Sequence, residues 1–504
     1  MPLLDAQPLG AVPLAGGLVE FRVWAPRARS VAVELQRREL PLAEAGEGIF
    51  AGRLQAAPGD DYRFVLDGGA ALADPFSRSQ PEGLRGPSRV VDTGAFAWSD
   101  AGWQGVSLDE LVLYELHVGA FTEEGTFDAA IPHLERLRAL GITAIELMPV
   151  ATFPGDRGWG YDGVYTFAPH RAYGGPEGLV RLVDAAHAAG LGVFLDVVYN
   201  HLGPGAEELA AFGPWFSDRH TTPWGPAPDF RQDPVREWVL QNAELWVRDF
   251  HVDGLRLDAV NRVADDAPRH VLAELADRVR AASPHALVVS ETHEGDFTPL
   301  DRWGHDAEWE NSFHHALHAL LTGERDGYYA PYGTVGDLAR AYEQPRARRV
   351  VAYGQNHDQI GNRALGDRLT PAQDRLALAA LAFAPHVPLL FMGEEYRETR
   401  PFQFFTDHLD PAVAEATRLG RRDEFRRFRG FDGELPDPQD ERTLSRSKLS
   451  HDPPDPEVAR LLALRRALPP GLETEVDEAA RRLTVRRGPH TLRLDFAALT
   501  AEVS

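Results

Sequence analysis

The segment DGLRLDAV, residues 253–260, carries an arginine and an aspartate at alternating positions of an otherwise apolar strand. Because side chains alternate across a strand, Arg256 and Asp258 share one face while Leu255 and Leu257 share the other. If the polar face met water, the pair would need no further explanation. If it faces a protein interior, the arginine helps to keep Asp258 ionised, and an ionised carboxylate is able to attack an electrophilic carbon.

Carboxylates also end two other predicted strands, so that Asp258, Glu291 and Asp358 would face a common centre. Each one taken alone is explained by a salt bridge or a helix cap. Together, like charges push their pKa values apart, so one group keeps a proton while another stays ionised. Glycoside hydrolysis needs such a set, with one carboxylate attacking the sugar carbon and another protonating the leaving oxygen. Further polar residues at predicted strand ends are Asp196, Asn200, His201 and His357.

The elements that must position these residues alternate between strand-like runs and helical periodicity. Seven strands are predicted, and an eighth is expected near AEWENSF, residues 307–313. Repeated βα units imply a parallel sheet. Eight units favour a closed (β/α)8 TIM barrel over an open doubly wound sheet, and no glycine-rich phosphate fingerprint follows the first strand. In a barrel, the polar face of GLRLDAV points to the interior or its mouth, where barrel active sites are built.

Two smaller domains are expected to flank the barrel. Residues 1–97 contain short alternating strands between turns, which predicts an N-terminal β-sandwich of the carbohydrate-binding kind. Residues 98–430 form the predicted catalytic barrel. Residues 431–504 are expected to contain a Pro- and Asp-rich linker, one helix and a small C-terminal β domain.

Aromatic and imidazole side chains near the predicted strand ends are candidates for sugar contacts. Tyr161 is favoured because GWGYDG forms a glycine-hinged loop at the rim. His201 and His357 stand where sugar hydroxyls need hydrogen-bond partners, although buried, satisfied histidines are the alternative. Most tryptophans simply pack, but rings that could stack on sugars are Trp159, Trp215, Trp224 and Phe313.

A metal site is not expected. His314 and His318 lie at i and i+4 in FHHALH, a spacing that suits zinc, but no glutamate base lies between them and no third ligand is evident. A helix-packing role is favoured for both. The proposed chemistry needs no cofactor, because side chains supply the acid and the nucleophile; a structural calcium is left open.

The composition limits the partners. Among 504 residues, 76 are acidic and 52 are basic, giving a net charge of -24. This disfavours nucleic acid and anionic membranes and favours a neutral substrate. There is no cysteine, which excludes disulfides, thiolate metal sites and cysteine nucleophiles. With no signal peptide recognised and no apolar run of about 20 residues, a cytoplasmic location is expected.

The motifs DVVYNH, GLRLDAV, SETHE and QNHDQIG resemble, in order and spacing, the recurring segments of the α-amylase family of glycoside hydrolases. The resemblance covers about residues 21–449. It implies that Asp258 is the nucleophile, Glu291 the general acid/base and Asp358 the third carboxylate, which binds and distorts the sugar. It also implies sugar-binding roles for Tyr161, Asp196, His201, Arg256 and His357.

Longer segments resemble a trehalose-releasing subgroup of that family, among them residues 114–131, 145–164, 391–408 and 435–449. The resemblance implies a retaining hydrolase that cuts the α-1,4 bond next to the terminal trehalose of malto-oligosyltrehalose. Its expected metabolic companion is the synthase that makes this substrate. One difference is that Asn311 and Ser312 stand where the subgroup suggests an acidic pair. The alternatives are a branching or debranching enzyme of the same family and a non-catalytic glucan-binding protein.

Overall fold

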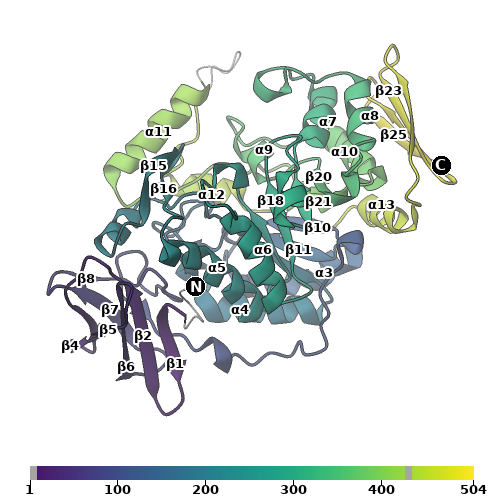
Figure 1. The fold of residues 1–504 in the computed structure, drawn as a ribbon. Coiled ribbons are helices and arrows are strands. Elements are labelled where there is room, and N and C mark those ends of the chain that lie inside the picture. Colours follow the sequence, from purple (N-terminus) through teal and green to yellow (C-terminus); the bar gives the residue numbers. More distant parts are fainter. Residues whose placement is uncertain (1–7, 426–433) are drawn as a thin grey trace.

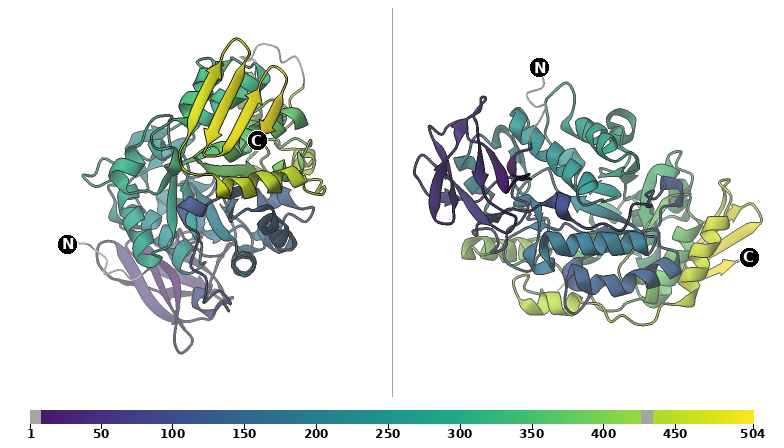
Figure 2. Two further views of the ribbon diagram at one scale, coloured as in Figure 1. Left: turned by 90° about the vertical axis from the view of Figure 1, so that its right-hand side faces the viewer. Right: turned by 90° about the horizontal axis from the view of Figure 1, so that it is seen from below.

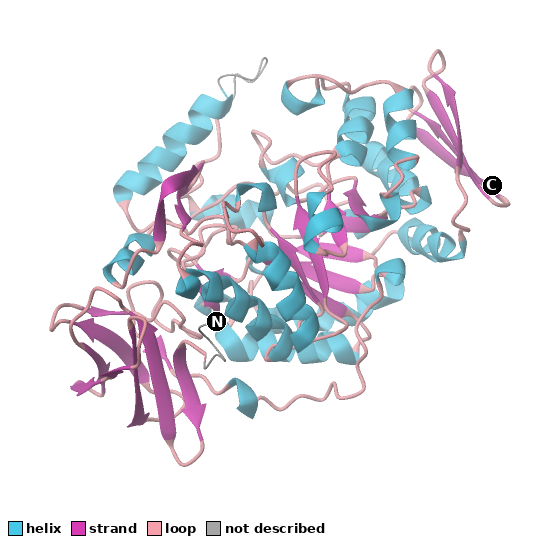
Figure 3. Cartoon of the chain, viewed as in Figure 1, coloured by secondary structure: helices cyan, strands magenta, loops and turns pink. Residues whose placement is uncertain are grey.

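The computed structural model describes residues 8–425 and 434–504. At its centre eight parallel strands form a closed barrel, with helices arranged around it (Figures 1 and 3). The predicted (β/α)8 architecture is therefore confirmed, and so is the expected eighth strand, which is β19. The barrel strands are β10 (Leu113–Leu116), β11 (Ala144–Leu147), β14 (Gly192–Val197), β17 (Gly254–Leu257), β18 (Leu287–Glu291), β19 (Ala307–Trp309), β20 (Val350–Tyr353) and β21 (Val387–Phe391).

The barrel interior has an apolar lower part and a polar upper part. Leu113, Phe194 and Val289 belong to a compact apolar cluster contributed mainly by the barrel strands. Two positions further along β10 and β14, on the same face of each strand, stand Glu115 and Asp196. On the inward face of these strands, apolar side chains therefore fill the base of the barrel and charged side chains lie toward its mouth.

One glycine allows the lower layer to close. A Cβ at Gly254 would collide with the Phe194 ring on the neighbouring strand β14. Glycine at the start of β17 therefore lets this aromatic ring fill the interior, directly below the polar residues that follow on the same strand.

Eight helices complete the outer layer. The last of them, α13, contacts both α3 and α10, so it occupies the space between the first and the seventh helix. Although its residues fall within the predicted C-terminal domain, α13 thus packs against barrel helices, and the predicted extent of that domain stays a prediction. The predicted boundary at residues 430/431 lies outside the described residues. The helices are α3 (Leu134–Leu140), α4 (Gly175–Ala188), α5 (Asp233–Arg248), α6 (Val271–Ala282), α7 (Ser312–Thr322), α8 (Val335–Tyr342), α10 (Pro371–Phe383) and α13 (Pro456–Ala467).

The N-terminal strands form two antiparallel sheets, as expected for a sandwich, and they lie to one side of the barrel (Figure 1). Tyr62, Phe21 and Phe64 pack edge to face in its core. The first sheet has the order β1 (Gly10–Leu14), β2 (Leu18–Trp24), β6 (Ile49–Gln55), β5 (Ala43–Glu44); the second contains β4 (Arg38–Pro41), β3 (Val31–Leu35), β7 (Asp61–Leu66), β8 (Ala71–Leu72) and β9 (Ser88–Arg89).

The C-terminal residues form a four-stranded antiparallel sheet on the opposite side of the barrel from the sandwich (Figure 2). Contacts with α8 and α10 hold it there. Within the described residues no helix is long and apolar enough to cross a bilayer. The strands are β22 (Glu473–Asp477), β23 (Arg482–Arg487), β24 (His490–Asp495) and β25 (Thr500–Val503).

Shorter elements lie in the loops between barrel strands. The hairpin of β15 and β16 lies between β14 and α5 in the chain, and α11 and α12 lie between β21 and α13. Their bounds are β12 (Ala151–Thr152), β13 (Tyr165–Pro169), β15 (Phe216–Thr222), β16 (Gly225–Pro228), α1 (Val118–Phe121), α2 (Phe127–Ala130), α9 (His357–Gly361), α11 (Pro411–Phe425) and α12 (Glu441–Ser447).

Candidate active site

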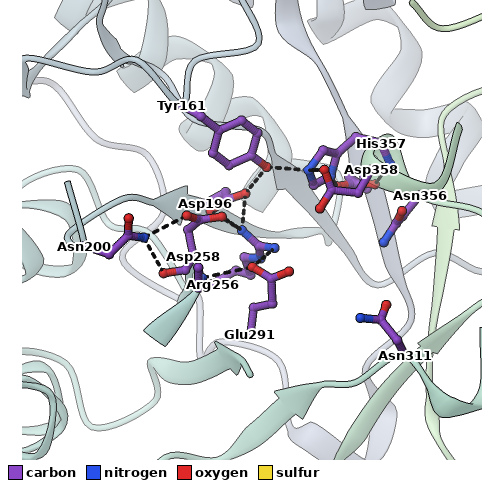
Figure 4. A network of polar contacts seen from close by, with 12 residues as sticks. Tyr161, Asp196, Asn200, Arg256, Asp258, Glu291, Asn311, Asn356, His357 and Asp358 are labelled. Carbon is purple, nitrogen blue, oxygen red and sulfur yellow. Dashed lines mark hydrogen bonds and ion pairs between the residues drawn. The ribbon is translucent and has the colours of Figure 1, made fainter. Parts of the chain in front are cut away.

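Arg256 is the centre of the polar cluster at the mouth of the barrel (Figure 4). It is fully buried on β17. Its Nη1 donates to both oxygens of Asp196 and to Oδ1 of Asp258, each at 2.9 Å. Its Nη2 lies 2.8 Å from Oε2 of Glu291. Burial disfavours the charged guanidinium, but the surrounding carboxylates, led by Asp196, raise the pKa of Arg256 well above its ordinary value. One permanent cation thus binds three acidic groups.

Glu291, at the end of β18, is the group in this cluster best suited to keep a proton. Burial raises its pKa to about 7, and the carboxylates of Asp258 and Asp358 add to the rise while Arg256 opposes it. Its Oε2 accepts a 2.9 Å hydrogen bond from the backbone N–H of Ala259. Ala259 is left-handed, with φ of 40°, so backbone strain is stored directly beside the acidic cluster.

Asp258 follows the last residue of β17 and is held on two sides. Arg256 donates to Oδ1, and the amide of Asn200 donates to Oδ2 at 2.9 Å and to the backbone oxygen of Asp258 at 3.0 Å. The side chain is 12% exposed, against 0% for Arg256. The carboxylate therefore has a fixed orientation and one accessible side.

His357 begins α9 after β20, and the carboxylate of Glu115 on β10 stabilises its positive charge. Oε1 of Glu115 lies 2.5 Å from Nδ1 of His357, and Oε2 accepts the His357 backbone N–H at 3.0 Å. Burial acts against the imidazolium, yet Glu115 and Asp358 together raise the pKa of His357 well above its ordinary value. His357 is therefore a buried cation at neutral pH.

Tyr161 and Asp358 surround the other ring nitrogen of His357. The Tyr161 hydroxyl lies 2.8 Å from Nε2 of His357 and donates to Asp196 at 2.6 Å. Nε2 also lies 3.4 Å from Oδ1 of Asp358. Burial pushes the pKa of Asp358 upward, but the positive His357 outweighs it and holds that pKa below its ordinary value. Asp358 is thus an ionised carboxylate, and 37% of its side chain is exposed.

Two buried tryptophans support these side chains. The Arg256 guanidinium lies 4.2 Å from the ring centroid of Trp309, a cation–π contact at the end of β19. Trp159 is 5% exposed, meets His357 edge to face, and donates its indole N–H to the Gln403 backbone oxygen. Trp159 therefore packs against His357 and helps to orient the imidazole ring, and it offers no open face on which a sugar could stack.

Trp224 is the exposed aromatic candidate near the site. It lies between β15 and β16, is 53% exposed, and stacks on His201 with centroids 4.8 Å apart. His201 in turn places Nδ1 2.5 Å from the Asn200 side-chain oxygen. The pair connects an open aromatic face to the residue that orients Asp258.

Phe313 is placed elsewhere, and the expectation that it contacts sugar is corrected. It is 0% exposed on α7, where it packs against Tyr342 and His386. Trp215 is likewise buried, between Trp24 of the sandwich and Trp238 of α5. Both rings are part of the core.

The two spaced histidines of α7 have protein partners. Nδ1 of His314 lies 2.9 Å from the Gly354 oxygen and Nε2 lies 3.0 Å from the Tyr329 hydroxyl. His318 pairs with Glu324 at 3.0 Å. In the described part of the chain, no group of three or more potential ligands is arranged to hold a metal ion.

Asn311 and Ser312 lie in polar contacts at the start of α7. The Tyr353 hydroxyl donates to the side-chain oxygen of Asn311, and Gln359 donates to the same oxygen at 3.3 Å. The Ser312 hydroxyl donates to Glu310 at 2.6 Å. The Ser312 hydroxyl and the Asn311 side-chain oxygen are therefore engaged with neighbouring side chains.

Sequence reasoning missed Glu115, Glu146 and Trp309 as contributors to the site. Glu115 and Glu146 are register partners on β10 and β11, and both are buried. Burial, with Glu115 as the next cause, raises the pKa of Glu146 well above its ordinary value, so Glu146 is protonated. The available signal was a carboxylate inside an apolar strand, as in LYEL and AIEL.

The arrangement provides an acid, a nucleophile and charge stabilisation within one cluster. Glu291 holds a transferable proton near neutral pH, and Asp258 offers a fixed oxygen. Asp358 adds a negative charge suited to an electron-poor sugar ring. This is the equipment for acid-assisted displacement at an acetal carbon.

Comparisons with known proteins agree with this chemistry. The alpha amylase catalytic-domain family matches residues 72–216. The malto-oligosyltrehalose trehalohydrolase of Deinococcus radiodurans is 44% identical over 478 residues, which span 88% of this chain and 79% of that protein. That of Saccharolobus solfataricus is 42% identical over 468 residues, spanning 86% of this chain and 82% of that protein.

A solved structure shares the architecture across nearly the whole chain. A crystal structure from Salmonella typhimurium, described as an alpha amylase, superposes with a TM-score of 0.87 at 37% identity, covering 97% of this chain and 93% of that one. The sandwich, barrel and C-terminal sheet therefore occur together in a known structure.

Proposed function

Because this chain belongs to the malto-oligosyltrehalose trehalohydrolase family, within the α-amylase glycoside hydrolases, we propose that it releases trehalose from malto-oligosyltrehalose. The bond cut is the α-1,4-glucosidic bond next to the terminal trehalose unit, and the other product is a shortened maltooligosaccharide.

The proposed reaction proceeds in two displacements with retention of configuration. Glu291 protonates the glycosidic oxygen as Asp258 attacks the anomeric carbon, which breaks the bond to the trehalose unit and forms a glycosyl ester on Asp258. Trehalose leaves. Glu291, now ionised, takes a proton from water, and the water oxygen attacks the same carbon and frees Asp258. The second step restores the proton to Glu291.

The single observation that carries this proposal is that Asp258 and Glu291 both contact the guanidinium of Arg256. The guanidinium contacts Asp258 at 2.9 Å and Glu291 at 2.8 Å. Burial together with the neighbouring carboxylates gives Glu291 a pKa of about 7, whereas hydrogen bonds from Arg256 and Asn200 hold the Asp258 side chain in a fixed orientation. Glu291 is thus suited to act as the acid, and Asp258 offers a fixed oxygen for attack.

The remaining side chains are proposed to bind the sugar ring in the cleavage position. Asp358 borders the open side of the cluster, with 37% of its side chain exposed, and lies next to the buried His357, which Tyr161 also contacts. The cationic His357 can donate to a sugar hydroxyl, and Asp358 stabilises positive charge on the ring in the transition state. Trp224 is proposed as a stacking surface beside His201.

The experiment that tests the proposal is product analysis with malto-oligosyltrehalose. The expected products are free trehalose and a maltooligosaccharide, and an unmodified maltooligosaccharide of equal length should be cut more slowly. Good cleavage of the plain glucan with no trehalose from malto-oligosyltrehalose would remove the substrate assignment while leaving the hydrolase chemistry in place.

The alternatives give different products. A branching enzyme would form α-1,6 linkages in amylose and change its iodine staining, and a debranching enzyme would remove such linkages. A non-catalytic glucan-binding protein would leave all these substrates intact.

The companion synthase that makes malto-oligosyltrehalose is proposed as the metabolic partner, because this activity consumes its product. The cytoplasmic location expected from the sequence stays a prediction.

A further inference from the structure

A second cavity lies at the opposite end of the barrel from the catalytic mouth. Its volume is about 680 Å³, within the range of roughly 300–1,000 Å³ that small-molecule sites occupy. Residues that precede barrel strands form one wall, including Val112 before β10, Thr143 before β11 and Gly190 before β14. Leu468 and Pro470, between α13 and the C-terminal sheet, form another. The cavity thus joins the barrel base to the C-terminal sheet.

Arginine dominates the charged lining of this cavity. Two carboxylates, Asp109 and Glu110, line it against five arginines. In a chain with a net charge of -24, such a local excess of positive charge runs against the overall balance. We call this site the basal arginine cavity, defined by Arg138, Arg348, Arg465, Arg466 and Arg487.

Most of these arginines lack an acidic partner. Arg348 lies 3.0 Å from Asp109. Within residues 8–425 and 434–504, no carboxylate lies within ion-pair distance of the other four guanidinium groups, which belong to Arg138, Arg465, Arg466 and Arg487. Arg138 and Arg466 are exposed to water and Arg465 is half-buried, whereas Arg487 is buried. Buried charges in proteins are normally paired, so the charge of Arg487 is the one that lacks a counter-charge inside the protein.

Some of the hydrogen bonds that these arginines donate have a structural role. Arg465 and Arg487 both donate to the Ala384 oxygen at the C-terminal end of α10, at 2.5 and 3.3 Å, where positive charge is favourable. Arg466 donates from Nη2 to the Gly141 oxygen at 2.9 Å. Helix capping therefore explains why arginines are present, but it does not neutralise them.

Donors remain free for a ligand. Arg487 is 94% buried, and it donates to Pro469, Phe383 and Ala384 from Nε and Nη1, which leaves its Nη2 without an acceptor among the described residues. Arg466 uses only Nη2 in the described contacts. Burial, the larger cause, and the neighbouring Arg487 charge, the next, lower the pKa of Arg465 to about 9, so part of this shift comes from repulsion between the two cations. An anion in the cavity would remove that repulsion.

We propose that the basal arginine cavity binds a small molecule carrying a phosphate group. A phosphate dianion matches the planar guanidinium fork and supplies the charge that the lining lacks. A ligand bound between α13, the barrel base and β23 would also tie the C-terminal sheet to the barrel. This site does not depend on the proposed trehalose-releasing activity.

Isothermal titration of the full chain at constant ionic strength tests the proposal, with inorganic phosphate and glucose 6-phosphate as separate probes. Saturable binding with one site is expected for at least one probe. Tighter binding of glucose 6-phosphate identifies an organic phosphate as the occupant, and equal binding identifies inorganic phosphate. Absence of saturable heat with both probes overturns the proposal.

Variants distinguish this cavity from the catalytic mouth, where a sugar phosphate could also bind. Arg466→Gln and Arg487→Gln are each expected to weaken binding by about tenfold, the loss of one charge-assisted hydrogen bond. Arg493→Gln is the matched control, because Arg493 is an exposed residue of β24 outside the cavity. If Arg487→Gln unfolds, Arg466→Gln alone decides. Unchanged affinity in a folded Arg466→Gln variant, or equal weakening in Arg493→Gln, contradicts the proposal.

Discussion

The pH dependence of cleavage follows from the environment of Glu291. Its pKa of about 7 means that about half of the molecules carry the catalytic proton at pH 7. An ordinary glutamate, with a pKa of about 4.3, would carry it in roughly one molecule in 500. Burial at the barrel mouth therefore increases the competent acid at neutral pH by about two orders of magnitude. As pH rises through about 7 this advantage is lost, and kcat/KM should fall tenfold per pH unit above it.

The assay is kcat/KM for malto-oligosyltrehalose between about pH 5 and about pH 10, which reports the pKa values of the free enzyme. A glycosyl fluoride of the same maltooligosaccharide is the matched substrate, because fluoride leaves without being protonated. The decline near pH 7 should disappear with the fluoride when the first displacement limits the rate. A decline at the same pH with both substrates, or a decline only above about pH 9, refutes the assignment of Glu291 as the acid.

Three variants extend the test. Asp258→Asn keeps the shape of the side chain and its neighbours but removes the nucleophile, so kcat should fall by about 10³-fold or more while circular dichroism and substrate binding stay close to wild type. Glu291 stays protonated up to about pH 7 when folded but only to about pH 4.3 when unfolded, so its contribution to the unfolding free energy falls as pH rises between these values. Denaturant unfolding at pH 8 should therefore show Glu291→Gln more stable by ~3–4 kcal/mol, and a less stable variant would contradict the raised pKa. Glu115→Gln removes the largest contribution that keeps His357 charged, so the unfolding free energy should drop by ~3–5 kcal/mol. The pKa of His357, followed by NMR of the ring proton, should fall as well. Glu146→Gln, which replaces a protonated neighbour, is the control and is expected to change neither quantity.

The barrel could be predicted because its strands and helices have different hydrophobic periods. The eighth strand, β19, is only three residues long, Ala307–Trp309, yet the count of βα units required a strand there. The place of α13 could not be predicted in the same way. Periodicity shows that a helix forms, but which neighbours it packs against depends on the path of a long connection after β21.

The central site residues could be predicted because each ends a strand with a charge that an apolar run does not otherwise carry. Glu115 was missed because its role depends on what lies beside it: only the closed barrel brings it within 2.5 Å of His357, which is 242 residues away in the chain. Trp309 reads as an ordinary core residue until the Arg256 guanidinium is seen 4.2 Å from its ring.

Phe313 was misread for a related reason. It stands at the end of AEWENSF, where the eighth strand is expected, and an aromatic ring at a strand end was a candidate for sugar contact. The helix α7 begins at Ser312, and the phenylalanine turns into the core against Tyr342. A single aromatic residue at the start of a helix gives no signal of which side it faces.

The most direct test of the account is to identify the carboxylate that becomes glycosylated. The Glu291→Gln variant, incubated with a maltooligosyl fluoride, should form the glycosyl ester but hydrolyse it slowly, because no base activates water. Proteolysis and mass spectrometry should then find the added sugar on Asp258. A sugar on Asp358 or another residue, or release of a product with inverted configuration and no adduct, would contradict the account.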